Sequence, residues 1–303
     1  MISVCIPVYN HVVVPLADEL IRQASLLEAE VELVFIDDCS TDEYRMHNLS
    51  LEDKGNYILL NHNVGRSRIR NLFLEHAKGD YLIFIDNDVK VPEKFLANYV
   101  ATLSQSPSVV VGGIRYGRRP KDDAYALRYQ YGSASETRSA AIRSRHPYRS
   151  FMTGNFMIRT DLLRQYPFDE TITGYGHEDT MMGYTLGQHQ VPILHIDNPV
   201  ICDYLETNDV FLNKSCEAVA NLVALYRTHF QNDAFCHSVR LVETYLKLAH
   251  AHLTGVVEAA FKLLRRPLRS HFLAGSATSV AEFNFYKLGL FCTMLSDSKS
   301  SRT

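Results

Sequence analysis

The sequence predicts an α/β protein, in which a mostly parallel β-sheet carries helices on both faces and a helical extension follows towards the C-terminus. Short apolar runs alternate with amphipathic runs over the first 90 residues, which is the order expected of βαβ units. The apolar runs show no polar alternation, as is typical of strands buried on both faces. From about residue 208 onward, apolar residues recur at helical spacing, so this part is predicted to be helical.

The expected strands are short apolar runs, many of them rich in β-branched and aromatic residues that favour strand conformation. They cover 2–9, 31–36, 57–60, 81–85, 109–114, 151–159 and 191–196. The expected helices are the intervening runs with amphipathic spacing. They cover 15–29, 41–52, 66–77, 92–103 and a segment opening at 174–179 and ending at 186, then 211–230, 235–264 and 280–295 in the extension.

Residues 115–149 interrupt this alternation, with nine Lys/Arg against three Asp/Glu and few long apolar runs. We expect a loop with some helix there. Arginine suits bidentate contacts to phosphate, so this stretch could order over a diphosphate or a phosphorylated acceptor. A solvated loop is the alternative interpretation.

Length, charge and cysteine content restrict the class of protein. The 303 residues fit one α/β domain over 1–205 and an extension over 206–303. Because the formal net charge is −3, a dedicated nucleic-acid-binding protein is disfavoured. The 46% hydrophobic residues support a packed core. Six scattered cysteines without a C-x-x-C pair indicate a reducing compartment.

The sequence starts with a strand-like run and shows no basic segment or cleavage site of a signal peptide. No apolar stretch approaches the roughly 20 residues that span a bilayer, so we expect a cytoplasmic protein. The extension's apolar stripes are expected to form its core or a homo-oligomer interface. A basic cluster leaves open a peripheral contact with the inner face of the membrane, although an ordinary basic helix end also explains it. The cluster consists of Lys262, Arg265, Arg266 and Arg269.

Asp86-Asn87-Asp88 directly follow the apolar run 81–85. Open α/β sheets bind ligands at the carboxyl ends of their strands, and carboxylate oxygens suit Mg²⁺ or Mn²⁺, which often share their shell with substrate phosphates. A solvated turn is the alternative, because Asp and Asn are frequent in turns. Three further polar clusters fall at predicted strand ends, at 7–10, 37–38 and 178–179. The clusters at 7–10 and 37–38 should lie at the same edge of the sheet as 86–88.

Together these segments resemble the motifs of the family 2 glycosyltransferases, which are inverting enzymes with the GT-A fold. Five segments match in the family's order: 4–10 (VCIPVYN), 34–42 (VFIDDCSTD), 63–71 (NVGRSRIRN), 79–88 (GDYLIFIDND) and 176–179 (GHED). The resemblance implies metal-dependent transfer from a nucleotide-diphosphate sugar, expected to be a UDP-sugar, to a hydroxyl of a glycan or lipid-linked acceptor. By analogy alone, the product belongs to a bacterial surface polysaccharide of the cell envelope.

The resemblance also implies donor-site residues. Those expected to hold the nucleobase and ribose are Pro7, Tyr9 and one of Asp37 and Asp38, of which Asp38 is preferred. A tyrosine ring can stack on a base, and a carboxylate can accept the N3–H of uracil. Alternatively, the acidic pair only shapes a turn and caps the next helix. Arg70 is expected at the diphosphate or the base edge, unless it pairs with Glu75 on its own helix.

Asp86 and Asn87 are expected to contact the ribose or the sugar, and Asp88 to be the direct ligand of Mn²⁺ or Mg²⁺. Such an ion assists the departure of the nucleoside diphosphate as a Lewis acid. His195 is the expected further metal ligand, although a lone histidine is also commonly structural. Cys202 stands near the position where a bacterial branch of the family often has another histidine, so the third ligand stays open.

Asp179 is the expected general base for the acceptor hydroxyl, with Glu178 hydrogen-bonded to the acceptor. Such proton transfer contributes about 10²–10⁴-fold in rate. Alternatively, both are first-turn acids favoured by a helix dipole. Gly154 is expected under the acceptor, where glycine permits a close approach.

Two other classes of function remain in view. A sugar nucleotidyltransferase would need a glycine-rich phosphate loop after the first strand, and 10–14 (NHVVV) is not one. A non-catalytic protein that binds nucleotide sugar or scaffolds a glycan-assembly complex would keep the fold without turnover. The acidic residues at positions 86, 88, 178 and 179 argue against such a loss of activity.

Overall fold

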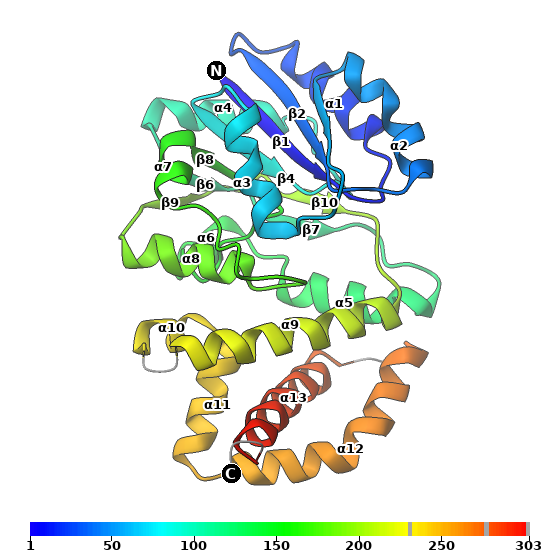
Figure 1. Cartoon of the computed structure of the whole chain (residues 1–303), viewed down its shortest axis with the longest axis vertical. Coiled ribbons are helices and arrows are strands. Elements are labelled where there is room, and N and C mark those ends of the chain that lie inside the picture. Colours follow the sequence, from blue (N-terminus) through cyan, green and yellow to red (C-terminus); the bar gives the residue numbers. More distant parts are fainter. Residues whose placement is uncertain (230–231, 276–278, 301–303) are drawn as a thin grey trace. The chain divides into compact units, whose positions relative to one another are not determined.

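A seven-stranded sheet, in the order β3-β2-β1-β4-β8-β6-β9, forms the centre of the N-terminal part of the chain (Figure 1). The computed structural model describes residues 1–229, 232–275 and 279–300. β8 is antiparallel to β4 and β6, and all other pairs in this sheet are parallel, which confirms the predicted α/β class. The strands are β1 Ile2–Val8, β2 Val31–Asp37, β3 Asn56–Leu59, β4 Tyr81–Ile85, β6 Val109–Val111, β8 Asn155–Arg159 and β9 Ile193–His195.

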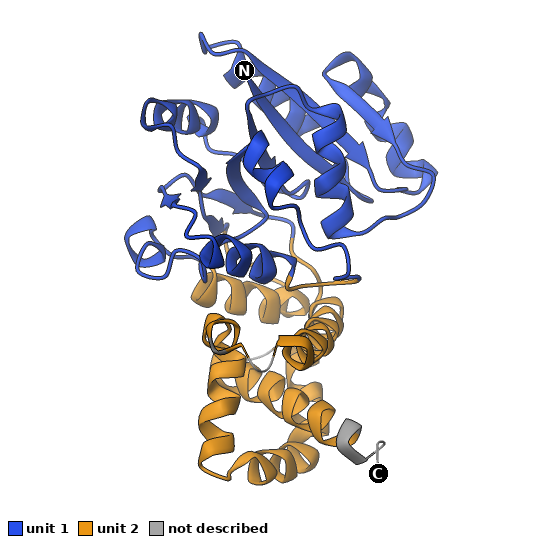
Figure 2. Cartoon of the chain, turned by 60° about the vertical axis from the view of Figure 1, so that its left-hand side comes forward, with its two compact units in different colours: residues 1–117, 137–173, 178–204 blue, residues 118–136, 174–177, 205–303 orange. Residues whose placement is uncertain are grey.

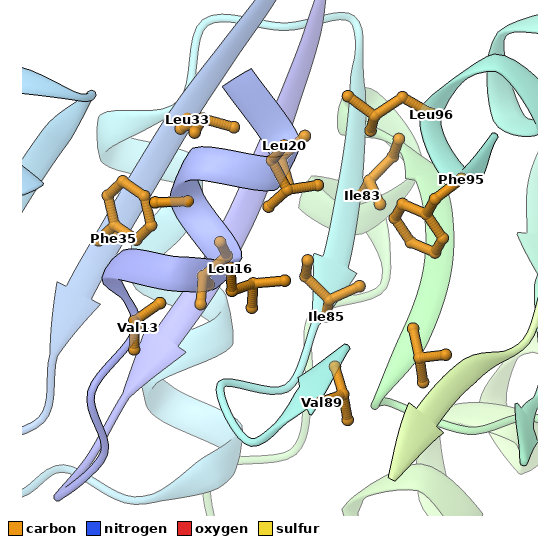
Figure 3. Close-up of a cluster of buried hydrophobic side chains, with 14 of the residues drawn as sticks. Val13, Leu16, Leu20, Leu33, Phe35, Ile83, Ile85, Val89, Phe95 and Leu96 are labelled. Atoms are coloured by element: carbon orange, nitrogen blue, oxygen red, sulfur yellow. The ribbon is translucent and has the colours of Figure 1, made fainter. Parts of the chain in front are cut away.

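Side chains of the central strands alternate between two apolar clusters, one on each face of the sheet. On one face, Leu16 and Leu20 of α1 and Phe95 of α4 pack with Ile83 and Ile85 of β4 (Figure 3). On the other face, α3, α7 and α8 contribute the covering residues. Burial on both faces explains why the strands lack polar alternation. The helices are α1 Val14–Ala24, α2 Asp42–Asn48, α3 Arg66–His76, α4 Phe95–Thr102, α6 Ala140–Arg143, α7 Thr160–Gln165 and α8 Glu178–Gln188.

Glycines interrupt two of the predicted strands. The expected strand 109–114 divides into β6 and β7 (Ile114–Tyr116), because Gly113 has a φ of +92°. The expected strand 151–159 begins only after Gly154. β7 pairs with β10 (Val200–Cys202), which also pairs with β5 (Val89–Lys90). This second sheet was not predicted, since strands of two or three residues leave no periodic signal.

The chain forms two compact units (Figure 2). The first contains Met1–Gly117, Thr137–Thr173 and Glu178–Tyr204. The second contains Arg118–Glu136, Gly174–His177 and the described residues from Leu205 onward. The predicted division assigned all of 1–205 to one domain, whereas two internal segments of that range and Leu205 belong to the second unit.

The second unit is helical and has an aromatic core. Its helices are α5 Ala126–Ser135, α9 Asn208–His229, α10 Asp233–Ser238, α11 Arg240–His250, α12 Thr254–Ala274 and α13 Val280–Ser300. Phe272 of α12 lies 5.4 Å from Phe283 and 5.6 Å from Tyr286, measured between ring centroids. The single helix expected over 235–264 is instead interrupted at Val239, which is extended, and at His252, whose φ is +56°.

Short 3₁₀ segments complete the described structure, and they are η1 Leu49–Asp53, η2 Leu103–Gln105 and η3 Asp123–Tyr125. Residue Phe230, the predicted end of the first extension helix, lies outside the described residues. Within the described ranges, none of the helices has the length and apolar character needed to cross a bilayer.

Candidate active site

Asp37 and Asp38, the predicted acidic pair after β2, have different surroundings. Asp37 is fully buried and accepts hydrogen bonds from Ser40 N at 2.6 Å and from the Tyr57 hydroxyl at 3.1 Å. Both of its oxygens are therefore engaged within the chain. Asp37 therefore helps to shape the turn after β2, and its expected place among the nucleotide-binding residues stays a prediction.

Asp38 lies one residue further, beyond the carboxyl end of β2. Its two oxygens accept hydrogen bonds from the backbone N–H groups of Val64 at 2.6 Å and Gly65 at 3.2 Å, just before α3 begins. Burial raises the pKa of Asp38, although these two N–H groups act against the rise. Each carboxylate oxygen has a second lone pair, so Asp38 can still accept a hydrogen bond from a ligand.

Tyr9 follows the neighbouring strand β1 and leaves 53% of its surface exposed. The amide of Asn87, in the turn after β4, donates to the Tyr9 carbonyl oxygen at 3.3 Å and so joins the ends of β1 and β4. Pro7 is half-buried within β1 and pairs in register with Ile36 of β2. An exposed ring at this edge offers a flat apolar surface to a planar ligand.

Arg70 connects the end of β4 with the start of α8. Its guanidinium is 2% exposed, and Nη2 donates to Asp86 Oδ1 at 3.0 Å while Nη1 donates to the Arg66 carbonyl at 2.9 Å. Nη1 also lies 3.9 Å from Glu178 Oε1. The alternative pairing with Glu75 is not found. Because so little of Arg70 reaches the surface, we assign it to hold Asp86 and Glu178 rather than to contact the diphosphate directly.

The two acids of the late motif begin α8, as the helix-dipole interpretation also expects. Glu178 is buried, with Arg66 Nη1 at 3.4 Å and the Thr153 hydroxyl donating at 3.5 Å. Burial alone would raise the pKa of Glu178, but the charges of Arg66 and Arg70 hold it below its usual value. Glu178 is therefore an anion at neutral pH.

Asp179 differs from its neighbour in protonation. Burial and the adjacent Glu178 charge raise the pKa of Asp179 to about 7, although the Thr180 N–H, which donates at 2.6 Å, acts against the rise. A carboxyl group that titrates near neutral pH can accept a proton efficiently in a reaction, as a general base must. The shifted pKa makes Asp179 the candidate general base of this site.

Glu178→Gln should move the acidic limb of the pH–rate profile to lower pH. A base must be deprotonated, so the wild-type rate is expected to rise with pH through about 7, the pKa of Asp179. Removing the Glu178 charge removes one cause of the raised pKa, and the midpoint falls. The rate of nucleotide release between pH 5 and 9 measures it. Glu75→Gln, an exposed acid on α3, is the matched control, and an unchanged midpoint in Glu178→Gln would contradict the assignment.

Gly154 lies directly against Asp86. A Cβ at this position would stand 2.6 Å from Asp86 Oδ2, closer than real Cβ atoms approach. Glycine is therefore required for Asp86 to keep its place beside Arg70. The sequence predicted a close approach of the acceptor at Gly154, which stays a prediction; the structure adds a close approach to this carboxylate.

Gly154→Ala should weaken nucleotide binding about tenfold, with little change in fold. This is the loss of affinity expected when a hydrogen-bonded carboxylate is displaced. Titration calorimetry and thermal unfolding together check this. Gly255→Ala is the control, because a Cβ there meets nothing within 4 Å. Equal affinity in the two variants would mean that Asp86 does not contact the donor.

His195 does not carry a free ring nitrogen. Arg143 Nη1 donates to its Nδ1 at 2.9 Å, so Nε2–H donates to the Pro147 carbonyl at 3.1 Å. Burial lowers the pKa of His195 to about 4, and the ring is neutral. Since both nitrogens serve the fold, we do not retain His195 as a metal ligand.

Arg143 was missed as an individual residue, because it belongs to the basic stretch 115–149. It is 2% exposed and donates to the carbonyl groups of Val111, Gly112 and Ile196 at 2.9, 3.1 and 2.6 Å. This arginine thus joins β6 to the segment after β9. Neither the solvated-loop nor the phosphate-loop interpretation applies to it.

The donor set for a metal ion is small. Asp88 lies half-buried in the turn between β4 and β5. In the described part of the chain, no three His, Cys, Asp or Glu side chains gather as a closed metal site. One or two carboxylates fit an ion that takes its other ligands from substrate phosphates and water, as Mg²⁺ commonly does. These residues therefore fit a substrate-bridged ion and not a structural one.

Comparison with known proteins identifies the family. A sequence model described as glycosyl transferase family 2 matches residues 3–167, more than half of the chain. The chain therefore belongs to glycosyl transferase family 2, as the resemblance of its motifs predicted.

Curated relatives are similar over part of their length. Validoxylamine A glucosyltransferase of Streptomyces hygroscopicus subsp. jinggangensis is 29% identical over 227 residues, which are 64% of this chain and 53% of that protein. Undecaprenyl-phosphate 4-deoxy-4-formamido-L-arabinose transferase of Proteus mirabilis is 32% identical over 130 residues, 41% of this chain and 39% of that protein. The chain thus spans about half, or less, of the length of these relatives.

A solved structure supports the fold. Mannosyltransferase PcManGT of Pyrobaculum calidifontis, in complex with GDP-Man and Mn²⁺, has a TM-score of 0.55 and 18% sequence identity. The match covers 98% of this chain and 86% of that one. At this identity the likeness shows the fold alone, and it agrees with the predicted GT-A fold.

Proposed function

We propose that this family 2 glycosyltransferase is a metal-dependent inverting enzyme that moves a sugar from a UDP-sugar to a hydroxyl of a glycan or lipid-linked acceptor. The observation that carries the proposal is the bridge from Asp86 through Arg70 to Glu178, with Asp179 next to it at a pKa of about 7. This bridge joins a carboxylate suited to the donor with Glu178, the ionised neighbour of the candidate base Asp179. Such a pairing of sites is what transfer between two substrates requires.

The donor side is assigned from the strand ends. The exposed Tyr9 ring stacks on the nucleobase, and Asp38 accepts its N–H. Asp86, oriented by Arg70, accepts hydrogen bonds from ribose or sugar hydroxyls, with Asn87 beside it. Asp88 would hold Mn²⁺ or Mg²⁺, and that ion would supply Lewis-acid neutralisation of the leaving diphosphate. The Mn²⁺ in the mannosyltransferase structure supports this choice of ion.

The acceptor side follows from the two acids of α8. Asp179 accepts the proton of the acceptor hydroxyl as that oxygen forms a bond to the anomeric carbon. The bond from this carbon to the diphosphate oxygen breaks, and the electron pair leaves with the nucleoside diphosphate. Attack opposite the leaving group inverts the anomeric configuration. Glu178, kept ionised by Arg66 and Arg70, raises the pKa of Asp179 and so keeps it basic.

The donor nucleotide has its own test, because the mannosyltransferase structure with the same fold is in complex with GDP-Man. Titration calorimetry with UDP, GDP and CDP, each with and without Mn²⁺, tests it. We expect UDP to bind most tightly and Mn²⁺ to strengthen its binding. Tighter binding of GDP would replace UDP in the proposal, and no binding of any of the three would overturn it.

The other two functions have distinct readouts. A sugar nucleotidyltransferase would release pyrophosphate from a nucleoside triphosphate and a sugar phosphate. The segment between β1 and α1 contains no glycine, which disfavours that class. A non-catalytic protein would bind nucleotide sugar without turnover on any acceptor. Such a protein would have no use for a carboxyl group whose pKa is raised to about 7, as that of Asp179 is.

A further inference from the structure

The ends of β1 and β2 stay joined beyond the point where their backbone ladder stops. The register of the two strands ends at Val8 and Asp37, and the N–H of Asp38 still donates to the Val8 carbonyl at 2.8 Å. The chain then turns away from the sheet at Asn10 and Cys39, whose φ angles are +46° and +64°. A left-handed residue cannot continue an extended strand, so backbone pairing ends here.

Side chains continue the connection between the two turns. The Asn10 N–H donates to the Ser40 hydroxyl oxygen at 2.9 Å, and the Thr41 N–H donates to Asn10 Oδ1 at 2.9 Å. Because a backbone N–H can only donate, the Asn10 atom that faces Thr41 is the amide oxygen. Each turn therefore gives one hydrogen bond to the other. We call Asn10, Ser40 and Thr41 the strand-end link.

Asparagine suits position 10 for two reasons. It is one of the few residues other than glycine that readily adopt a left-handed backbone. Its side chain also provides the acceptor for the Thr41 N–H, which glycine lacks. Ser40, which accepts the second hydrogen bond, is only 4% exposed, so water cannot easily replace its hydroxyl.

The strand-end link lies next to two residues of the proposed donor site. Tyr9 directly precedes Asn10, and Asp38 stands two residues before Ser40. We propose that Asn10 is a positioning residue, which sets the place of Tyr9 relative to Asp38 and thereby the selectivity for the nucleobase. This inference rests on the proposed function, in which Tyr9 stacks on the base and Asp38 accepts its N–H.

The two pyrimidines differ at the atom that Asp38 would contact. Uracil carries a hydrogen on N3 and can donate it to a carboxylate, whereas N3 of cytosine carries none and only accepts. A site built to accept a hydrogen bond discriminates against a ligand that lacks the donor, provided that the acceptor is correctly placed. The affinity for UDP divided by that for CDP therefore reports the placement of Asp38.

Asn10→Gly tests the side chain of the link. Glycine permits the left-handed backbone but removes the acceptor for the Thr41 N–H. We expect the ratio of UDP to CDP affinity, measured by titration calorimetry with Mn²⁺, to fall about fivefold, the factor that corresponds to one hydrogen bond. Asn10→Asp restores an acceptor oxygen and should bring the ratio back, since its added charge acts on both nucleotides alike. Ser106→Gly, at an exposed residue with a φ of +47° just before β6, is the matched control and should keep the wild-type ratio.

Ser40→Ala removes the acceptor of the other hydrogen bond and should lower the same ratio. The double variant Asn10→Gly/Ser40→Ala should lose less than the sum of the two single effects, because both substitutions act on one link. Thermal unfolding of each variant separates placement from stability. An unchanged ratio in Asn10→Gly, even with a lower unfolding midpoint, would make the link purely structural and overturn the proposal, as would a fall that Asn10→Asp does not reverse. A wild-type protein without preference for UDP over CDP would instead contradict the base contact of Asp38 in the proposed function, and this inference would fall with it.

Discussion

Asp179→Asn is expected to lower turnover by about 10²–10⁴-fold, the usual contribution of a general base, while nucleotide binding stays unchanged. Asparagine has nearly the same size but cannot accept a proton from the acceptor hydroxyl at neutral pH. Steady-state rates, together with calorimetric titration of the nucleotide, separate the two effects. Wild-type turnover in this variant would remove Asp179 as the base.

The same substitution should not cost stability, and this distinguishes a catalytic acid from a structural one. The pKa of Asp179 rises from 3.8 to about 7 on folding, so ionising this group in the folded state lowers the free energy of unfolding. That loss builds up as pH rises from about 4 to about 7 and then stays constant. A neutral Asn removes it, and thermal unfolding at pH 8 should show an equal or higher midpoint.

Asp161→Asn is the control for the helix-dipole interpretation. Asp161 is also a first-turn acid, on α7, and it is exposed and paired with Arg159. Removing a carboxylate there takes away a dipole interaction of about 0.3–1 kcal/mol without touching the proposed site. If Asp179→Asn only matched Asp161→Asn, with a small loss of stability and normal turnover, both acids would be helix-terminal residues and nothing more.

Asp88→Ala is expected to abolish the response of the rate to Mn²⁺ and to reduce turnover by at least about 10²-fold, because stabilisation of the leaving diphosphate is worth several kcal/mol. Rates measured across a Mn²⁺ titration check both parts. Asp80→Ala is the matched control. Asp80 lies just before β4, is exposed and pairs with the N-terminal amine of Met1, so its loss should be nearly neutral. A folded Asp88→Ala variant with a normal Mn²⁺ response would exclude Asp88 as the ligand.

The central sheet was predictable because its strands are buried on both faces and are bounded by polar residues. β4 spans Tyr81–Ile85 as predicted, between Asp80 and Asp86. The division of β6 from β7 depends on tertiary contacts instead. A Cβ at Gly113 would meet Arg143 Nη2 at 2.8 Å, and Arg143 comes 30 residues later in the chain. Local sequence cannot show that approach.

The sequence predicted which residues form the site better than it predicted the contacts that each of them makes. The motifs placed Asp86, Arg70 and Glu178 at one site, and the structure brings them together. Burial and partner choice could not be read from the motifs, so Arg70 was expected at the diphosphate. Arg66, the nearest cation to Glu178, stands at the start of the same helix, four residues before Arg70. That spacing on one helix face was a signal that could have found it.

His195 shows which kind of contact the sequence could not predict. His195 ends β9 close to a predicted sheet edge, which made ligation plausible. Burial and the Arg143 charge keep its ring neutral, and its two nitrogens are engaged by Arg143 and the Pro147 carbonyl, both some 50 residues earlier in the chain. Contacts of that separation have no local sequence signature.

The most direct test of the central claim is nucleotide release by the purified protein from a panel of nucleotide sugars, with and without Mn²⁺. Transferases of this kind commonly hydrolyse their donor slowly, so the acceptor need not be known. The account predicts Mn²⁺-dependent release of UDP from one sugar of the panel, at a rate that rises with pH through about 7, the pKa of Asp179. Tight nucleotide-sugar binding without release, even after addition of mixed glycan and lipid-linked acceptors, would contradict it.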